Sequence, residues 1–123
     1  MPAADTAHFK ISELVCKHCG QGAGYIQPAL MAALERVRER YGKPMLVTSG
    51  YRCALHNAEI GGAKYSAHKE GKAADIADPQ GELASLLTPE TCAELGIWIE
   101  DPRATRGWVH ITIRPAAQRV FWP

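Results

Sequence analysis

The stretch Ser66-Ala67-His68-Lys69-Glu70-Gly71-Lys72-Ala73-Ala74-Asp75 carries an imidazole and a carboxylate on either side of a glycine. Far downstream, Trp108-Val109-His110 adds a second imidazole. Two imidazoles and one carboxylate suit a catalytic zinc ion, which takes three protein ligands and keeps a fourth position open for water. We therefore predict that His68, Asp75 and His110 converge on one metal ion and that the chain is a hydrolase.

The segment 108–113 has the alternating pattern of a half-buried strand. Side chains along a strand point to opposite faces in turn. One face therefore holds the apolar side chains Val109, Ile111 and Ile113, and His110 lies on the other face. The pattern alone places this histidine on the side of the sheet that faces away from the core.

The segment 72–76 is also predicted to be a strand, and it places Asp75 on the face opposite Ala74 and Ile76. The small neighbours of Asp75 leave room for an ion and a bound ligand. A loop that turns at the glycine before this strand can bring His68 back over it. Local spacing thus allows the candidate ligands to meet on one face.

A helix is predicted over 28–41, where Leu30, Leu34 and Val37 recur at helical spacing behind a proline in the first turn. The other predicted elements are an entry segment at 9–15, strands at 45–48 and 97–100, a short helix at 52–60, and a helix at 89–96 capped by Thr88. Helices come early, and strands are spread through the remainder. This order favours an α+β fold with helices on one face of a small, mainly antiparallel sheet.

Length and composition favour one domain over 1–123 with a loose end at 1–8. The chain is 46% hydrophobic and 22% charged, an ordinary composition for a folded protein. The net charge of +1 argues against nucleic acid as a partner, and no apolar run is long enough to span a membrane. Because residues 1–10 show no secretory signal, we expect synthesis in the cytoplasm. We also expect a monomer.

Four cysteines allow several interpretations. Cys16 and Cys19 have the C-x-x-C spacing of half a zinc knuckle, but Cys53 and Cys92 stand alone in the sequence. A chain that stays in the cytoplasm keeps its thiols reduced by default. We therefore favour reduced thiols or a local disulfide in a structural loop over a second metal site or a redox function.

The chain contains an ordered series of short motifs: Ser49-Gly50-Tyr51-Arg52, His56-Asn57, Gly61-Gly62, Ser66-x-His68-x-x-Gly71-x-Ala73-x-Asp75-Ile76 and Trp108-Val109-His110. Together they resemble the zinc D-alanyl-D-alanine carboxypeptidase family over roughly residues 28–113. This family includes vancomycin-resistance D,D-peptidases and phage endolysins. It shares a fold with lysostaphin-type peptidases and the hedgehog signalling domain, so the resemblance implies the same fold here.

The resemblance also implies a role for each matching position. The three candidate ligands correspond to the family's zinc ligands, so one catalytic zinc ion is the implied cofactor, which activates water and polarises the scissile carbonyl. Arg52 corresponds to an arginine that contacts the substrate and the developing oxyanion. Ser66 lies at a position near the bound peptide in relatives. Trp108 is a further candidate for substrate contact.

The sequence departs from the family at the general base. Many relatives have Glu-x-x-His before the last ligand, but Gly107 occupies the glutamate position here. Glu100 is the first candidate to replace it, because it ends a predicted strand whose following loop returns to His110. Asp101 is the second candidate. The alternative interpretation of Glu100 is a solvated acid at the end of a strand.

The resemblance implies a peptidase that cuts peptide bonds in peptidoglycan stem peptides. It does not separate a D,D-carboxypeptidase from an endolysin-type endopeptidase of phage origin. Either enzyme would act on the cell wall after release from the cytoplasm. The alternative is a non-catalytic zinc-binding domain, such as a phage structural or peptide-binding protein, and Gly107 is its main support.

Overall fold

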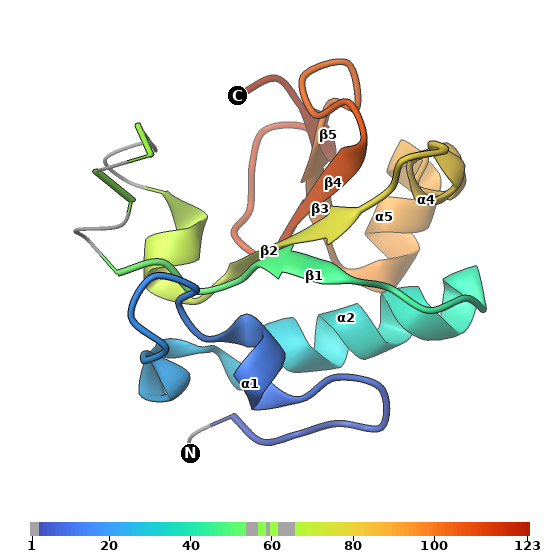
Figure 1. Ribbon diagram of the computed structural model, residues 1–123. Helices are drawn as coiled ribbons and strands as arrows, with labels where there is room; N and C mark the ends of the chain where they lie inside the picture. Colours follow the sequence, from blue (N-terminus) through green and yellow to red (C-terminus); the bar gives the residue numbers. More distant parts are fainter. Residues whose placement is uncertain (1–2, 54–56, 59, 62–65) are drawn as a thin grey trace.

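The computed structural model describes residues 3–53, 57–58, 60–61 and 66–123. Its strands are β1 (Val47–Ser49), β2 (Ala73–Ala77), β3 (Trp98–Glu100), β4 (Trp108–Thr112) and β5 (Val120–Phe121). They form a five-stranded sheet in the order β1-β2-β4-β3-β5 (Figure 1). Neighbouring strands are antiparallel except β3 and β5, which are parallel. The prediction of an α+β fold with a mainly antiparallel sheet is confirmed.

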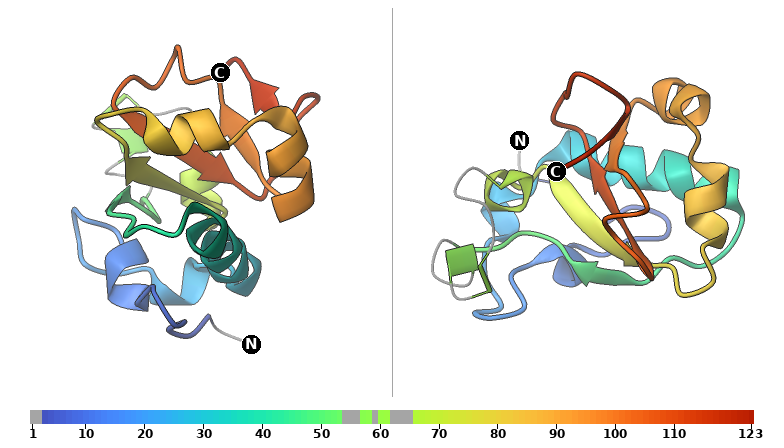
Figure 2. Two further views of the ribbon diagram at one scale, coloured as in Figure 1. Left: turned by 90° about the vertical axis from the view of Figure 1, so that its right-hand side faces the viewer. Right: turned by 90° about the horizontal axis from the view of Figure 1, so that it is seen from above.

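The helices are α1 (Ile11–Leu14), α2 (Pro28–Tyr41), α4 (Glu82–Leu86) and α5 (Pro89–Leu95), with 3-10 helices η1 (Ala23–Tyr25) and η2 (Ala67–Glu70). The long helix α2 lies along one face of the sheet and contacts α5 (Figure 1). Seen from above, β2 and β4 lie in front of α2 (Figure 2). None of the described helices is long and apolar enough to cross a membrane.

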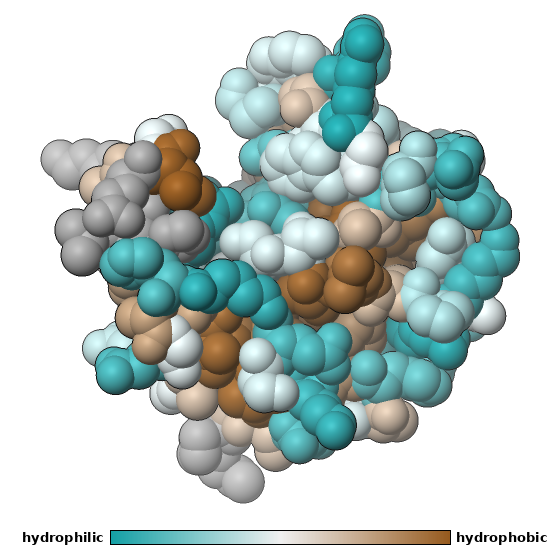
Figure 3. Space-filling model, viewed as in Figure 1, coloured by the Kyte–Doolittle hydropathy of each residue, from teal (hydrophilic) through white to brown (hydrophobic). Residues whose placement is uncertain are grey.

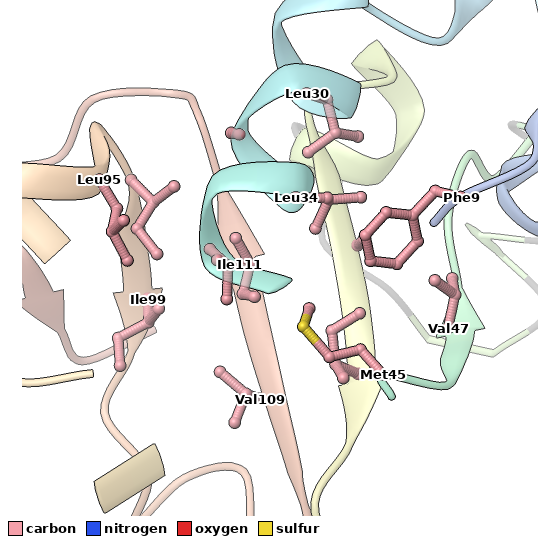
Figure 4. Close-up of a cluster of buried hydrophobic side chains, with 14 of the residues drawn as sticks. Phe9, Leu30, Leu34, Met45, Val47, Leu95, Ile99, Val109 and Ile111 are labelled. Carbon is pink, nitrogen blue, oxygen red and sulfur yellow. The ribbon is translucent and has the colours of Figure 1, made fainter. Parts of the chain in front are cut away.

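The helix α2 begins and ends where its sequence predicts. Pro28 occupies the first turn, and Gly42 ends the helix with a φ of 74°. Leu30 and Leu34 of this helix lie with Ile111 of β4 in the buried cluster (Figure 4). Burial stabilises the fold by roughly 1.5–3 kcal/mol for each such side chain. The hydrophobic core therefore lies between α2 and the face of the sheet that this helix covers.

The alternation predicted for β2 and β4 is confirmed. The core cluster contains Ala74, Ile76, Val109 and Ile111. Asp75 and His110 lie between these residues in the chain and are hydrogen-bonded to each other rather than packed in the cluster. The period of two thus separates the core face of the sheet from a polar face.

Thr6 and His8 are bound to Glu35 of α2, although we expected residues 1–8 to be a loose end. The carboxylate of Glu35 accepts a hydrogen bond from the Thr6 hydroxyl at 2.7 Å. The His8 ring lies 2.9 Å from the other oxygen of the same carboxylate. Phe9 then enters the core, where it is 1% exposed. Apolar burial and a shared carboxylate therefore order residues that composition alone marks as an end.

Several segments differ from the prediction. Of the helix expected at 52–60, residues 57–58 are helical, Arg52 and Cys53 are not, and residues 54–56 and 59 lie outside the described residues. The loop expected before β2 contains η2. Neither α4 nor β5 was predicted. The helix α4 begins where the Asp78 carboxylate accepts hydrogen bonds from two backbone N–H groups, and β5 is too short to show a period.

Candidate functional site

Side chains from η2, β2 and β4 converge on the polar face of the sheet. Asp75 Oδ1 lies 3.1 Å from Nε2 of His68 and 2.9 Å from Nδ1 of His110. One ligand atom from each of the three residues lies within 4.8 Å of the other two. Asp75 and His110 are direct cross-strand partners, which explains their proximity. The structure thus brings together the three residues that the sequence suggests as metal ligands.

The helix η2 carries His68 to the face of β2 that holds Asp75. Ser66 begins this helix, and its hydroxyl oxygen accepts a hydrogen bond from the His68 N–H at 3.2 Å. Gly71 ends it with a φ of 69°, and a Cβ there would lie 1.8 Å from the carbonyl oxygen of Tyr25. Glycine is therefore required at this turn. The expected return of His68 across a glycine turn is confirmed.

The ring of His68 is oriented by the backbone of Gly50. Its Nδ1 lies 2.8 Å from the Gly50 carbonyl oxygen, which can only accept, so Nδ1 carries a proton. Burial is the largest influence on the pKa of His68 and lowers it, despite the opposing effect of the Asp75 charge. The neutral ring therefore presents the Nε2 lone pair to a carboxylate oxygen at 3.1 Å. Two facing lone pairs repel each other, and a cation bound to both removes that repulsion, so these residues fit a metal ion.

Asp75 is ionised in this arrangement. Burial raises its pKa, but the neighbouring imidazole rings, His110 first and then His68, outweigh burial and lower the pKa to about 2. Its second oxygen lies 3.8 Å from the guanidinium of Arg52. Because metal ligands must be deprotonated, an aspartate held as the carboxylate is prepared for a divalent cation.

Arg52 lies against the candidate metal site. Its backbone N–H donates to the carbonyl oxygen of His68 at 3.2 Å, and its side-chain Nη1 donates to the side-chain oxygen of Asn57 at 3.1 Å. Its Nε is buried and has no hydrogen-bond partner among the described residues. Burial lowers the pKa of Arg52, whereas Asp75 and Glu100 raise it, and a guanidinium stays protonated in proteins. Arg52 also lines the cavity, where a guanidinium can meet a substrate oxygen.

A cavity of about 500 Å³ opens beside these side chains. In the space-filling view the surface is hollowed between the part that carries η2 and the part that carries the C-terminal segment (Figure 3). Ser66 and Trp108, the candidates for substrate contact, both line the cavity. The C-terminal segment contributes Arg114 and Phe121, which sequence reasoning missed. Both residues follow the last motif, and neither the charge of Arg114 nor the two-residue strand that contains Phe121 indicates in the sequence that the chain returns to the site.

The two candidate bases lie in different surroundings although they are neighbours in the chain. Glu100 lines the cavity. Asp101 is not among the described residues that line it, and its carboxylate accepts hydrogen bonds from the Arg103 backbone and guanidinium at 2.8–3.0 Å. These bonds, the Arg103 side chain first, lower the pKa of Asp101 to about 2. The geometry therefore favours Glu100 over Asp101 as a proton acceptor in the cavity.

The structure places one of the cysteines in a group that the sequence does not suggest. Cys53 stands alone in the sequence, but its Sγ lies 3.7 Å from that of Cys16. Cys16, Cys19 and Cys53 form a second group with ligand atoms within 4.8 Å of one another. Cys92 is buried in the core as a thiol. Sequence spacing could not reveal this group, because its cysteines come from two segments that are far apart in the chain.

Comparison with known proteins agrees with the site. No curated protein is significantly similar in sequence to this chain. The sequence model of the family described as Peptidase M15 matches residues 7–112, which include every residue of the His68-Asp75-His110 cluster. The match covers most of the chain and confirms the resemblance drawn from the motifs. The chain belongs to the Peptidase M15 family, the family of zinc D-alanyl-D-alanine carboxypeptidases.

Proposed function

We propose that this M15 metallopeptidase hydrolyses peptide bonds in the stem peptides of peptidoglycan. One observation carries the proposal: His68, Asp75 and His110 meet at a cavity that both histidines line. Three N and O ligands beside open space are the arrangement of a catalytic rather than a structural zinc site.

The three ligands would hold a zinc ion, which supplies a Lewis acid for the scissile carbonyl and activates water. Asp75 contributes the negative charge, and the Gly50 carbonyl keeps His68 in the tautomer that binds metal. Arg52 presents a buried N–H donor without a partner among the described residues. It binds and orients an oxygen of the substrate, either the carbonyl that gains charge or a terminal carboxylate.

Glu100 is the proposed general base. Its carboxylate lines the same cavity as the two histidines, and its negative charge raises the pKa of Arg52. It accepts a proton from the attacking water and returns that proton to the nitrogen of the leaving group. This assignment accounts for Gly107 at the position where many relatives carry their glutamate, because the carboxylate comes from the neighbouring strand β3 instead.

The cavity suits a peptide that ends in, or carries, a carboxylate. Arg52 and Arg114 both line it, together with the apolar rings of Trp108 and Phe121. Positive charge next to apolar surface favours a short peptide with a free carboxylate, as in a D,D-carboxypeptidase, and an open groove would favour an endolysin-type endopeptidase. We propose that the enzyme works as a monomer on the cell wall after release from the cell that makes it.

The test combines metal analysis with mass spectrometry of digested muropeptides. The zinc-loaded wild type is expected to shorten or cleave the stem peptides, and the masses of the products identify the bond. The Glu100→Gln variant is expected to bind the same zinc and leave the muropeptides intact. A zinc-loaded wild type that leaves all muropeptides intact contradicts the proposal and favours a non-catalytic zinc-binding domain, which Gly107 at the usual base position also suggests.

A further inference from the structure

A second group of metal-binding side chains lies outside the cavity. Cys16 and Cys19 belong to the loop after α1, and Cys53 belongs to the segment that follows β1. Figure 1 shows these two parts of the chain side by side. One sulfur from each cysteine lies within 4.8 Å of the other two. We call these three residues the thiol cluster.

The spacing of the sulfurs separates a metal site from a disulfide. The Sγ atoms of Cys16 and Cys53 are 3.7 Å apart. Two thiolates on one tetrahedral zinc ion lie about 3.8 Å apart, because each Zn–S bond is about 2.3 Å long. Sulfurs in a disulfide are separated by only about 2.05 Å. The observed distance excludes a disulfide and matches that of two ligands of one ion.

The backbone around Cys16 supports a thiolate. Its Sγ accepts hydrogen bonds from the backbone N–H groups of Cys53, Cys19 and His18. The loop is held in shape by a hydrogen bond of 2.7 Å from the Gly20 N–H to the Cys16 carbonyl oxygen, with a φ of 68° at Gly20. A tight turn that aims its N–H groups at a sulfur stabilises the charge that a metal ligand must carry.

The fourth ligand comes from the same loop. Nδ1 of His18 lies 4.0 Å from the Sγ of Cys53. This histidine also lies between two residues of the thiol cluster in the chain, which makes it the candidate for a fourth ligand. We propose that Cys16, Cys19, Cys53 and His18 bind a structural zinc ion that is separate from the zinc of the peptidase site. A closed set of three cysteines and one histidine is a ligand set of structural zinc, and its formation releases the protons of the three thiols.

The proposed ion fixes the backbone next to Arg52. Cys53 follows this arginine directly, and Tyr51 before it donates its N–H to the Leu14 carbonyl oxygen at 2.7 Å. A zinc ion on the thiol cluster therefore ties the loop after α1 to the residue that faces the substrate. Its role is to hold Arg52 in position, not to take part in the reaction.

The first experiment uses the wild-type chain, purified with a reductant, and counts its zinc by native mass spectrometry. Two zinc ions per chain are expected. Replacement of zinc by cobalt is expected to give an intense thiolate-to-cobalt charge-transfer band, which N and O ligands do not produce. A chain that shows no such band overturns the proposal, whether or not it binds zinc at the peptidase site. A Cys16–Cys53 disulfide found in the reduced preparation by peptide mapping overturns it as well.

Variants separate this site from the peptidase site. The double variant Cys16→Ser, Cys53→Ser is expected to lose one zinc ion and the charge-transfer band. The double variant Asp75→Asn, His110→Asn is expected to lose the other zinc ion and keep the band. Cys92→Ala serves as the matched control, because Cys92 lies in the core outside the thiol cluster, and it is expected to keep both ions. Retention of two zinc ions in the Cys16, Cys53 variant contradicts the proposal.

Discussion

The Nδ1 atom of His68 lies 2.8 Å from the carbonyl oxygen of Gly50. Gly50 itself is pressed against α1, because a Cβ at this position would lie 2.4 Å from the Leu14 carbonyl oxygen. The backbone that orients a candidate metal ligand is therefore held by the N-terminal helix. This contact explains why the chain before the first motif contributes to the site, although none of the residues described there lines the cavity.

Gly50→Ala is expected to destabilise the protein by about 1–3 kcal/mol, the usual cost of forcing extra volume into a packed site. The added methyl group moves the Gly50 carbonyl away from His68 and weakens zinc binding as well. Urea unfolding and zinc titration measure the two effects. Gly24→Ala is the control, since a Cβ there meets nothing within 4 Å. Equal stability of the Gly50 and Gly24 variants would contradict the packing argument.

His68→Ala is expected to remove one zinc ion per chain relative to the wild type, because it leaves only two ligands. His8→Ala is the control, because His8 contacts Glu35 of α2 and does not line the cavity. Elemental analysis of the purified proteins measures the difference. Full zinc retention in the His68 variant would defeat the assignment of the metal site.

Glu100→Gln is expected to keep zinc and to lower turnover by about 10²–10⁴-fold, the usual contribution of a general base. Asp101→Asn is the matched control, and it is expected to retain most activity because Asp101 is paired with Arg103 outside the cavity. Steady-state hydrolysis of a muropeptide compares the two variants. The reverse order of effects would move the base to Asp101.

Arg52→Lys is expected to lower kcat/KM by about 10²-fold or more while zinc binding is unchanged. A lysine keeps the charge but loses the planar fork of donors that binds a carboxylate or a developing oxyanion. Arg40→Lys on α2 provides the control for the same substitution at an exposed site. An unchanged kcat/KM in the Arg52 variant would argue that Arg52 serves only to pair with Asp75.

Glu35→Gln is expected to lower stability at neutral pH by about 1 kcal/mol, through weakened bonds to Thr6 and His8. Burial raises the pKa of Glu35, but bonds from His8 and Thr6 outweigh burial and lower the pKa below its usual 4.5. A lowered folded-state pKa stabilises the fold above pH 4.5, and that contribution is lost as the pH falls through the folded-state value. Urea unfolding from pH 7 down to pH 3 measures this effect. The gap between wild type and variant is expected to shrink as the pH falls, and a gap that grows contradicts the sign.

Local pattern was sufficient for the parts of the site that lie on regular elements. Asp75 and His110 were assigned to the polar face from the alternation of their neighbours, because the period of a strand acts at every second residue. The return of His68 followed from the glycine at the turn before β2. Local pattern could not decide between Glu100 and Asp101 as the general base, because they are adjacent and are distinguished only by their contacts with the following loop. Arg103 pairs with Asp101, which leaves Glu100 for the cavity.

The sequence by itself determined the helix over 28–41, the polar face of β2 and β4, and the candidate metal ligands. The helix and the polar face depend on neighbours within a few residues, where side-chain periodicity and turn chemistry are decided. The candidate ligands follow from their residue types and from the ordered motifs along the chain. Only the tertiary structure joined Cys53 to Cys16 and Cys19, added β5 beside β3, and returned Phe121 to the cavity. These pairings close long loops, and the packing of the whole core selects them, so no local pattern in the chain records them.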